Sequence, residues 1–356
     1  MDFTKLFRTL WRHAPREGRV SQAAVQRATP LESRVGPRAA AWVDGHWEHA
    51  QFEARAAQGF PALTLQYGLY LPPGAADSSG LPLVVMLHGC NQSGEAFARG
   101  TRMNVLADRY GFAVLYPDQT IQRHAHACWH WYDLAPAAGG GEAHAIAALV
   151  ASLVEQHAFD ATRVYLAGLS AGAGMAAALA FQYPQQFAAV ALHSGVVCGA
   201  TRSVVQALDI MRRGAAGDPA ALARAARADD HPGMPALLLH GALDDVVSPI
   251  NLTQLETQFL TLNQLIDETG ELVTGASLAA SEHEGQVDRE YRQAGQCRLK
   301  SCLIPGLGHA WSGGDDTVPY HAGIGPDASL AAWTFFEAQR RLPAPGATSR
   351  QKVYAD

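Results

Sequence analysis

The chain has 356 residues, with 27 basic and 33 acidic side chains and a formal net charge of −6. Hydrophobic residues make up 48% of the sequence and charged residues 17%, which excludes a disordered chain and suffices for a large buried core. Five cysteines in this length exclude a disulfide scaffold, and the acidic balance argues against a nucleic-acid-binding protein, which would carry a basic face.

Residues 1–40 form a basic extension with eight Lys or Arg side chains and three acidic ones. Its segment Phe3–His13 can form a short amphipathic helix, and a solvated arm is the alternative that its small length favours. No unbroken apolar run follows the first basic residue, so we expect no secretory signal and a cytoplasmic protein, with an extracellular one as the alternative. The longest uncharged stretch, 164–201, contains too many Gly, Gln, Pro, His and Ser residues to form a transmembrane segment.

Short apolar runs recur between residues 63 and 239 and are typical of strands buried in a parallel sheet. The expected strands are Leu63–Leu71, Leu83–Leu87, Phe112–Tyr116, Val164–Ala167, Phe187–Leu192 and Ala236–Leu239. Helical stretches separate them, and the clearest, Glu142–His157, repeats apolar side chains at helical spacing. This alternation predicts an α/β fold with a doubly wound, mostly parallel sheet and helices on both faces.

We predict one catalytic domain over residues 41–345, preceded by the extension and followed by a C-terminal tail, 346–356. The glycine-rich segment 135–141 is expected to be a loop. After the last of these strands we expect a helix from Asn251 to Asp267 and then a polar stretch to Gln296. Ligands of such sheets bind past the carboxyl ends of the strands, so the chemistry is expected there.

The segment 168–172, GLSAG, matches the G-x-S-x-G pattern of a nucleophile elbow. It lies between an expected strand and an Ala-rich helix that runs to about Phe181, which is the context that the pattern requires. There the Ser170 hydroxyl would stand at a helix N-terminus, where the helix dipole favours negative charge. The alternative is a Gly/Ser turn that only packs the helix on the strand.

A serine nucleophile needs a base and an acid that orients the base, and in this fold the acid precedes the base in sequence. Asp244 and Asp245 both follow an expected strand, and either carboxylate could be the acid. His309 lies in a glycine-rich loop past the apolar pair Leu303-Ile304 and is the predicted base.

The oxyanion hole needs two backbone N–H groups that point at the developing charge. We predict that Ala171 supplies one and that Cys90, in the loop after residue 87, supplies the other. Trp129, Trp131 and Trp311 are predicted to line the substrate cleft, with core packing as the alternative for the first two.

The spacing H-x-H-x-C-x-H at 124–130 is irregular for zinc, so we expect no metal there. A serine mechanism of this kind needs no organic cofactor, and we expect none. Without a secretory signal, the five cysteines are expected to be reduced. Cys90 with Cys128, and Cys297 with Cys302, are the pairs that could form disulfides instead.

Several segments resemble, in the same order, the poly(3-hydroxybutyrate) depolymerase esterases. They are 87–94 (LHGCNQSG), 112–119 (FAVLYPDQ), 128–131 (CWHW), 168–172, 240–251 (HG-x-x-D-x-x-V-x-P-x-N) and 306–314 (GLGHAWSGG). The resemblance spans about residues 60–340 and implies an α/β-hydrolase fold without a lid domain. It also implies Ser170 as nucleophile, Asp244 as acid and His309 as base.

We expect no secretory signal, linker or polymer-binding domain, and on that expectation the sequence is more similar to the intracellular short-chain-length polyhydroxyalkanoate depolymerases than to the secreted ones. The resemblance implies a serine esterase that hydrolyses poly(3-hydroxybutyrate) or its oligomers, with a storage-granule surface as an expected partner. One alternative is a carbohydrate esterase that cleaves feruloyl or acetyl groups from xylan. Another, of a different class, is a granule-binding protein whose triad is idle.

Overall fold

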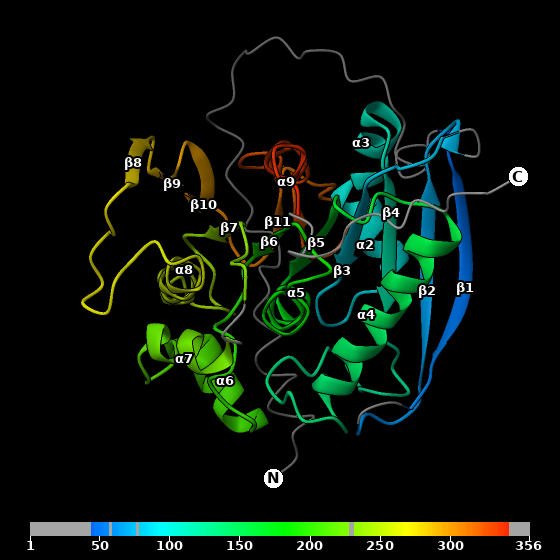
Figure 1. Cartoon of the computed structure of the whole chain (residues 1–356), viewed down its shortest axis with the longest axis horizontal. Helices are drawn as coiled ribbons and strands as arrows, with labels where there is room; N and C mark the ends of the chain where they lie inside the picture. The colour runs from blue at the N-terminus through cyan, green and yellow to red at the C-terminus, as the bar shows by residue number, and fades with distance from the viewer. Residues whose placement is uncertain (1–43, 57–58, 76–77, 228–230, 342–356) are drawn as a thin grey trace, which may run out of the picture.

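The computed structural model describes residues 44–56, 59–75, 78–227 and 231–341. The basic extension 1–40, with its expected helix, and the tail 346–356 therefore lie outside the described residues. A ten-stranded sheet runs through the molecule in the order β1-β2-β4-β3-β5-β6-β7-β10-β9-β8 (Figure 1). Its strands are β1 (His46–Ala54), β2 (Leu63–Leu71), β3 (Leu83–Leu87), β4 (Ala113–Asp118), β5 (Val164–Leu169), β6 (Ala189–His193), β7 (Ala236–Gly241), β8 (Ala276–His283), β9 (Gln286–Gln293) and β10 (Gln296–Ile304).

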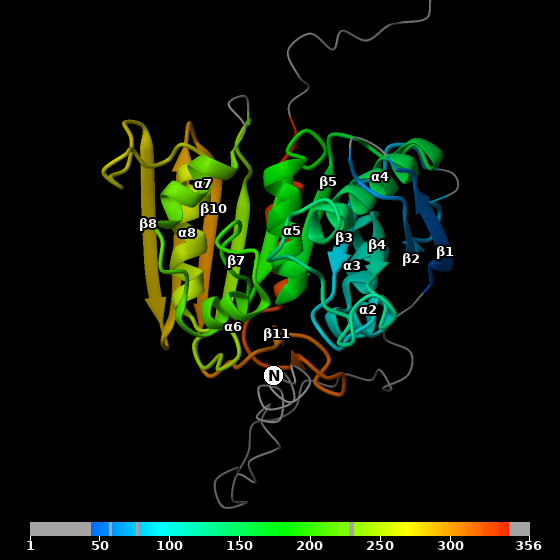
Figure 2. The same cartoon turned by 90° about the horizontal axis from the view of Figure 1, so that it is seen from below.

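The middle of the sheet is parallel and its two ends are antiparallel. Neighbours in the run β4-β3-β5-β6-β7-β10 pair in parallel, whereas β1 and β2 at one end and β8 and β9 at the other pair antiparallel. Figure 2 shows the strands side by side, from β8 at one end to β1 at the other. The carboxyl ends of the parallel strands therefore meet at one edge of the sheet.

Helices cover both faces of the sheet, as α4, α5 and α8 lie on one face and α2, α3 and α9 on the other (Figure 1). Strand β3 shows why, because all its side chains are buried and alternate between two core clusters. Leu83, Val85 and Leu87 belong to one cluster, and Val84 and Met86 to the other. Burial of each such side chain stabilises the fold by about 1.5–3 kcal/mol.

The helices are α2 (Gly94–Thr101), α3 (Met103–Tyr110), α4 (Gly139–Gln156), α5 (Ala171–Gln182), α6 (Val204–Arg213), α7 (Pro219–Ala226), α8 (Ile250–Leu262) and α9 (Ala328–Glu337). Two short strands, β11 (Trp311–Ser312) and β12 (His321–Ala322), pair beyond β10. Among the described helices, none combines the length and apolar character that crossing a bilayer requires. The predicted α/β-hydrolase architecture, a mostly parallel sheet between helices, is confirmed.

The six predicted strands form as β2 to β7, and two other predictions need correction. Gly139–Gly141 start α4 instead of ending a loop, and a Cβ atom on Gly139 would lie 1.9 Å from the His130 carbonyl oxygen, so only glycine fits there. The helix expected to reach Asp267 ends at Leu262, where the Asn263 amide donates back to the Phe259 carbonyl.

The polar stretch expected up to Gln296 contains two strands that were not predicted, β8 and β9. Side chains of β8 after its first residue are exposed, and seven of the eight in β9 are at least partly exposed. A strand with so little buried surface lacks the apolar run by which the other strands are recognised.

Candidate active site

Ser170 lies in a strained turn between β5 and α5. Its backbone has φ 57° and ψ −119°, a conformation that a residue with a side chain rarely adopts. The Ser170 N–H donates to the His193 carbonyl of neighbouring β6 at 2.9 Å, and α5 starts at the next residue. The turn therefore projects the hydroxyl beyond the strand end at a helix N-terminus.

Two glycines of the GLSAG segment are required by close backbone contacts. A Cβ atom on Gly172 would lie 2.0 Å from the Leu87 carbonyl oxygen, and one on Gly168 would lie 2.4 Å from the Gly172 carbonyl oxygen. These contacts let α5 start directly against β3 and β5. The pattern is therefore explained by sterics as well as by chemistry.

Gly172→Ala is expected to destabilise the protein by about 3 kcal/mol, because backbone atoms would have to move to admit the methyl group. Gly217→Ala is the matched control, since a Cβ atom there meets no atom within 4 Å. Urea unfolding of both variants measures the free energies. Equal stability of Gly172→Ala and the wild type would contradict the packing that we describe.

Asp244 and His309 form a hydrogen-bonded pair. His309 Nδ1 lies 2.8 Å from Asp244 Oδ2, while Asp244 Oδ1 accepts the N–H groups of Val246 and Val247 at 3.1 and 2.8 Å. Asp244 is buried, whereas Asp245 is exposed to solvent. Of the two candidate acids, the structure therefore brings Asp244 to His309.

Asp244 is held as a carboxylate. Burial by itself raises its pKa, but His309, His240 and the Val247 N–H together outweigh burial and lower the pKa of Asp244 to about 2. The carboxylate is therefore ionised near neutral pH and fixes the His309 ring through Nδ1.

Ser170, Asp244 and His309 follow strands β5, β7 and β10 at the same edge of the sheet, and β6 lies between β5 and β7. His193 at the end of β6 connects this region, because its carbonyl accepts from Ser170 and its Nε2 accepts the Ser312 N–H at 3.3 Å. Burial and then the neighbouring His240 lower the pKa of His193 to about 3. Its ring is therefore neutral near neutral pH, and its hydrogen bond with the Ser312 N–H links the end of β6 to β11.

The loop after β3 lies against the nucleophile. A Cβ atom on Gly89 would lie 3.5 Å from the Ser170 Cβ atom, and Cys90, Ser170 and Ala171 line the same pocket. The backbone N–H groups of Cys90 and Ala171 make no hydrogen bond to another described residue. Both predicted oxyanion donors are thus placed where a substrate oxygen could accept from them.

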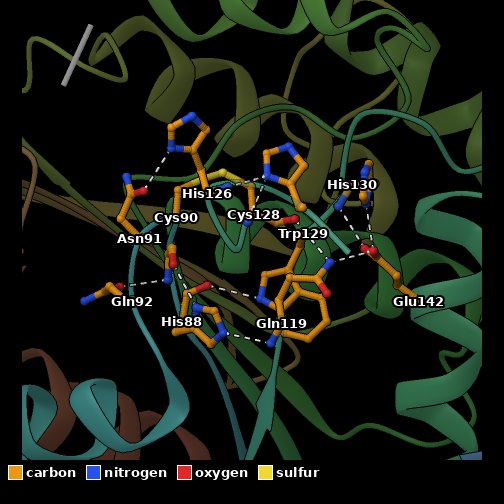
Figure 3. Close-up of a disulfide and its surroundings, with 12 residues drawn as sticks. His88, Cys90, Asn91, Gln92, Gln119, His126, Cys128, Trp129, His130 and Glu142 are labelled. Atoms are coloured by element: carbon orange, nitrogen blue, oxygen red, sulfur yellow. Dashed lines mark hydrogen bonds and ion pairs between the residues drawn. A yellow bond between two sulfur atoms is a disulfide. The ribbon is translucent and has the colours of Figure 1, made fainter. Parts of the chain in front are cut away.

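Cys90 and Cys128 form a disulfide, which corrects the expectation that all cysteines are reduced (Figure 3). The loop after β4 folds over the loop after β3, where the Asn91 N–H donates to the His126 carbonyl at 2.7 Å. This brings the Cα atoms of the two cysteines to 4.3 Å. Cys198, Cys297 and Cys302 are free thiols, the last two on the same strand, β10.

The pocket beside Ser170 has mainly apolar walls. Trp129 and Trp131 line it, and both rings are also largely buried in the core. Another part of the wall comes from α6, which sequence reasoning missed. Its pocket-lining side chains share one helical face and are Val204, Ala207, Leu208 and Met211. Their spacing of three and four residues is the signal that could have indicated this wall.

Trp311 does not line the pocket, which corrects its prediction as a cleft residue. The side chain is 1% exposed, and its Nε1–H donates to the Ser329 hydroxyl at the start of α9. Its ring packs edge-on against Phe97 of α2 with centroids 5.4 Å apart. The pairing of β11 with β12 turns this residue into the core, although it is only two positions from His309.

The histidines of segment 124–130 are packed against protein groups. His130 Nδ1 lies 2.7 Å from the buried Glu142 carboxylate. Burial, with His130 and His126 nearby, lowers the pKa of His124 to about 4, so this ring is neutral near neutral pH. Within the described ranges, no three His, Cys, Asp or Glu side chains are grouped as metal ligands would be.

Residues 65–282 match the family model described as Esterase PHB depolymerase. The chain belongs to this family. Poly(3-hydroxyalkanoate) depolymerase C of Paucimonas lemoignei is 31% identical over 251 residues, which are 69% of this chain and 58% of that protein. Probable acetylxylan esterase A of Neosartorya fischeri is 34% identical over 141 residues, 39% of this chain and 37% of that protein.

This member of the PHB depolymerase esterase family thus spans only part of those relatives, 58% of the first and 37% of the second. Among solved structures, an acetyl xylan esterase from Aspergillus awamori superposes with a TM-score of 0.61 at 21% identity. That comparison covers 81% of this chain and 99% of the other. The likeness shows that the two share a fold.

Proposed function

We propose that this protein is a serine esterase that hydrolyses poly(3-hydroxybutyrate) or its oligomers, with the surface of a storage granule as its partner. The observation that carries the proposal is the 2.8 Å hydrogen bond between His309 and the buried Asp244, at the sheet edge where Ser170 occupies the nucleophile elbow. A base that is oriented by a carboxylate can activate a serine hydroxyl there.

In the first half of the reaction, His309 Nε2 takes the Ser170 proton while Oγ attacks the ester carbonyl. The Cys90 and Ala171 N–H groups donate to the oxyanion of the tetrahedral intermediate. As the intermediate collapses, the ester C–O bond breaks, and His309 gives its proton to the departing alcohol. Asp244 keeps the other ring nitrogen, Nδ1, protonated throughout.

In the second half, His309 takes a proton from water, and the resulting hydroxide attacks the acyl-enzyme carbonyl. The same two N–H groups stabilise the second oxyanion. Collapse breaks the bond to Ser170 Oγ, which recovers its proton from His309, and the carboxylic acid leaves. The residues present account for every proton transfer.

Apolar surface around the site supports an aliphatic polyester as substrate. Ile121 (70% exposed) and Leu243 (67%) lie in the loops after β4 and β7, and Val205 (57%) is in α6, the helix whose other face lines the pocket. The pocket adds the mainly apolar walls of α6 and the two tryptophans. A sugar ester would instead need polar groups that pair with its hydroxyls. Similarity to the poly(3-hydroxyalkanoate) depolymerase of Paucimonas lemoignei also supports a polyester substrate.

The test is release of 3-hydroxybutyrate from amorphous polyhydroxybutyrate granules, beside hydrolysis of feruloyl and acetylxylan esters, by the wild type and Ser170→Ala. Release that requires Ser170 supports the proposal. Activity confined to the sugar esters would make the protein a carbohydrate esterase, the alternative for which acetylxylan esterases are the similar proteins. If the wild type and Ser170→Ala both bind granules and neither hydrolyses any of the esters, the protein is a granule-binding protein whose triad is idle.

The variant Ile121→Ser with Val205→Ser is expected to lower granule hydrolysis about tenfold, because each serine removes part of the apolar area that would contact the polymer. Hydrolysis of a small soluble ester should stay unchanged, since both side chains project into solvent. Leu278→Ser in β8 is the matched control, as it removes an aliphatic side chain that is 45% exposed and lies away from the site. Equal losses on both substrates would contradict a polymer-contact role.

A further inference from the structure

The apolar pocket beside Ser170 is placed to hold the acyl part of an ester. Ser170, Cys90 and Ala171 are among the residues that line it, and His309 is not. His309 has to reach the departing alcohol to protonate it, so the alcohol lies outside the pocket and the acyl group inside. The cavity has a volume of about 30 Å³, close to the share of one water molecule in the liquid. That leaves room for a group about the size of a methyl.

Helix α6 limits the width of this pocket. It lies on the side of α8 that faces away from the sheet (Figure 1). One face of α6 brings Leu208 and Met211 to the pocket, while Asp209 and Arg213 form an ion pair on its exposed face. A displacement of α6 would therefore change the space beside Ser170.

Asn251 ties the C-terminal end of α6 to the fold. This residue lies in the first turn of α8, and its side chain is completely buried. Its Nδ2 donates to the carbonyl oxygens of Ile210 and Met211, both at 3.1 Å, and of Ser248 at 3.0 Å. Ile210 and Met211 belong to the last turn of α6, where carbonyl groups lack partners within the helix. Asn251 thus caps the helix from outside.

The turn that precedes Asn251 also holds the predicted acid. The Ser248 N–H donates to the Met211 carbonyl at 2.7 Å. One residue earlier, the Val247 N–H donates to Asp244 Oδ1 at 2.8 Å, and Val247 also lines the pocket. Residues 244–251 therefore fix the α6 wall relative to the acid of the triad.

We propose that Asn251 is a positioning residue that sets the acyl-size selectivity of the esterase. By holding the end of α6, it keeps Leu208 and Met211 close to Ser170, so that the pocket admits a methyl-sized group and excludes a longer alkyl chain. In a poly(3-hydroxyalkanoate), this contact would select units with short side groups. The inference rests on the proposed function. It adds a residue that makes no hydrogen bond to Ser170, Asp244 or His309 and still decides which ester reacts.

The experiment measures kcat/KM of the wild type and Asn251→Ala for p-nitrophenyl octanoate relative to p-nitrophenyl acetate. Both esters are assayed on one preparation, so the ratio does not depend on the fraction of folded protein. The variant should fold, because the Ile210 and Met211 carbonyls still accept from the N–H groups of Gly214 and Ser248.

The wild type should prefer the acetate. In Asn251→Ala the octanoate-to-acetate ratio should rise about tenfold, through a lower KM for octanoate, since one methylene in an apolar pocket changes discrimination by about 10- to 200-fold. Damage that is only structural would lower both values together and leave the ratio unchanged.

Asn263→Ala is the matched control, because Asn263 is a buried residue of the same type at the other end of α8. Its Nδ2 donates to the Met234 carbonyl at 2.7 Å and the Phe259 carbonyl at 2.8 Å, before β7 begins. The ratio should stay within about twofold of the wild type. Met211→Ala widens the wall directly, so adding Asn251→Ala to it should raise the ratio by less than in the wild type.

An unchanged ratio in Asn251→Ala would overturn the inference, as would a wild type that prefers octanoate, an equal rise in Asn263→Ala or full additivity with Met211→Ala. If Asn251→Ala does not fold, Gln254→Ala takes its place. The Gln254 side chain accepts the Ala215 N–H at 2.8 Å and donates to the Ala215 carbonyl at 2.9 Å, just past α6. An unchanged ratio there would count equally against the inference.

Ser170→Ala in the same assay separates the two levels of the argument. Turnover that survives in Ser170→Ala would refute the serine mechanism itself. Turnover that requires Ser170, with a ratio that Asn251→Ala does not move, would refute only the role of Asn251.

Discussion

Ser170→Ala is expected to fold normally and to lose ester hydrolysis by a factor of about 10⁶. The substitution removes the only atom that can form the acyl-enzyme, while the strained turn and its hydrogen bond to His193 stay as they are. Initial rates on a soluble ester measure the loss, and unfolding curves check the fold.

Ser194→Ala is the matched control for this prediction. Ser194 follows the neighbouring strand β6, also has a positive φ, 50°, and is fully buried. It should keep most of the activity, because no step of the mechanism uses its hydroxyl. Similar losses in the two variants would mean that general damage to the sheet edge, and not removal of a nucleophile, explains the result.

His309→Ala and the Ser170→Ala/His309→Ala double variant should each be about as slow as Ser170→Ala, because the members of a triad act as a unit. If the rate loss of the double variant equals the product of the two single losses, Ser170 and His309 act independently, and the proposed proton transfer between them is wrong.

Asp244→Asn is expected to lower kcat about 10⁴-fold and to leave the fold intact. The carboxylate now accepts from His309, Val246 and Val247 at once. An amide would present a donor toward either His309 or the backbone N–H groups, and a His309 ring that has turned to the other tautomer cannot accept the Ser170 proton. Steady-state kinetics on a soluble ester measure the effect.

Asp245→Asn is the control, because it makes the same chemical change one residue away on an exposed side chain. It should leave kcat within about twofold, since surface substitutions away from special features have small effects. A large loss in Asp245→Asn together with a small one in Asp244→Asn would reverse our assignment of the acid.

The depressed pKa of Asp244, about 2, also links this residue to stability at acid pH. An unfolded Asp titrates near about 3.9, so the stabilisation from ionised Asp244 is complete above that pH and is lost as the pH falls through about 2. The stability difference between wild type and Asp244→Asn should therefore shrink over this range, and unfolding curves at several pH values measure it.

Local patterns predicted the parts of the fold that are built from consecutive residues. Strands β2 to β7 appear as apolar runs because strands that are covered on both faces must be apolar at every position. Strands β8 and β9 were missed because most of their side chains remain partly or fully exposed, so no comparable run marks them.

Residue types alone did not decide which neighbours reach the site. Asp244 and Asp245 are chemically identical, and only the turn after β7, in which Val246 and Val247 donate to one of them, buries Asp244 beside His309. Trp311 looked suited to the cleft because it lies near His309. The short pairing of β11 with β12 instead turns it toward α2 and α9.

By itself, the sequence determined the α/β architecture, the elbow at Ser170 and the candidate acid and base, because each depends on periodicity or on spacing along the chain. Only the tertiary structure decided the Cys90–Cys128 disulfide, the α6 wall of the pocket and the hydrogen bonds from Asn251 to that wall. These contacts join segments that follow different strands. Their partners are set by how the strands are ordered in the sheet, which spacing along the chain does not encode.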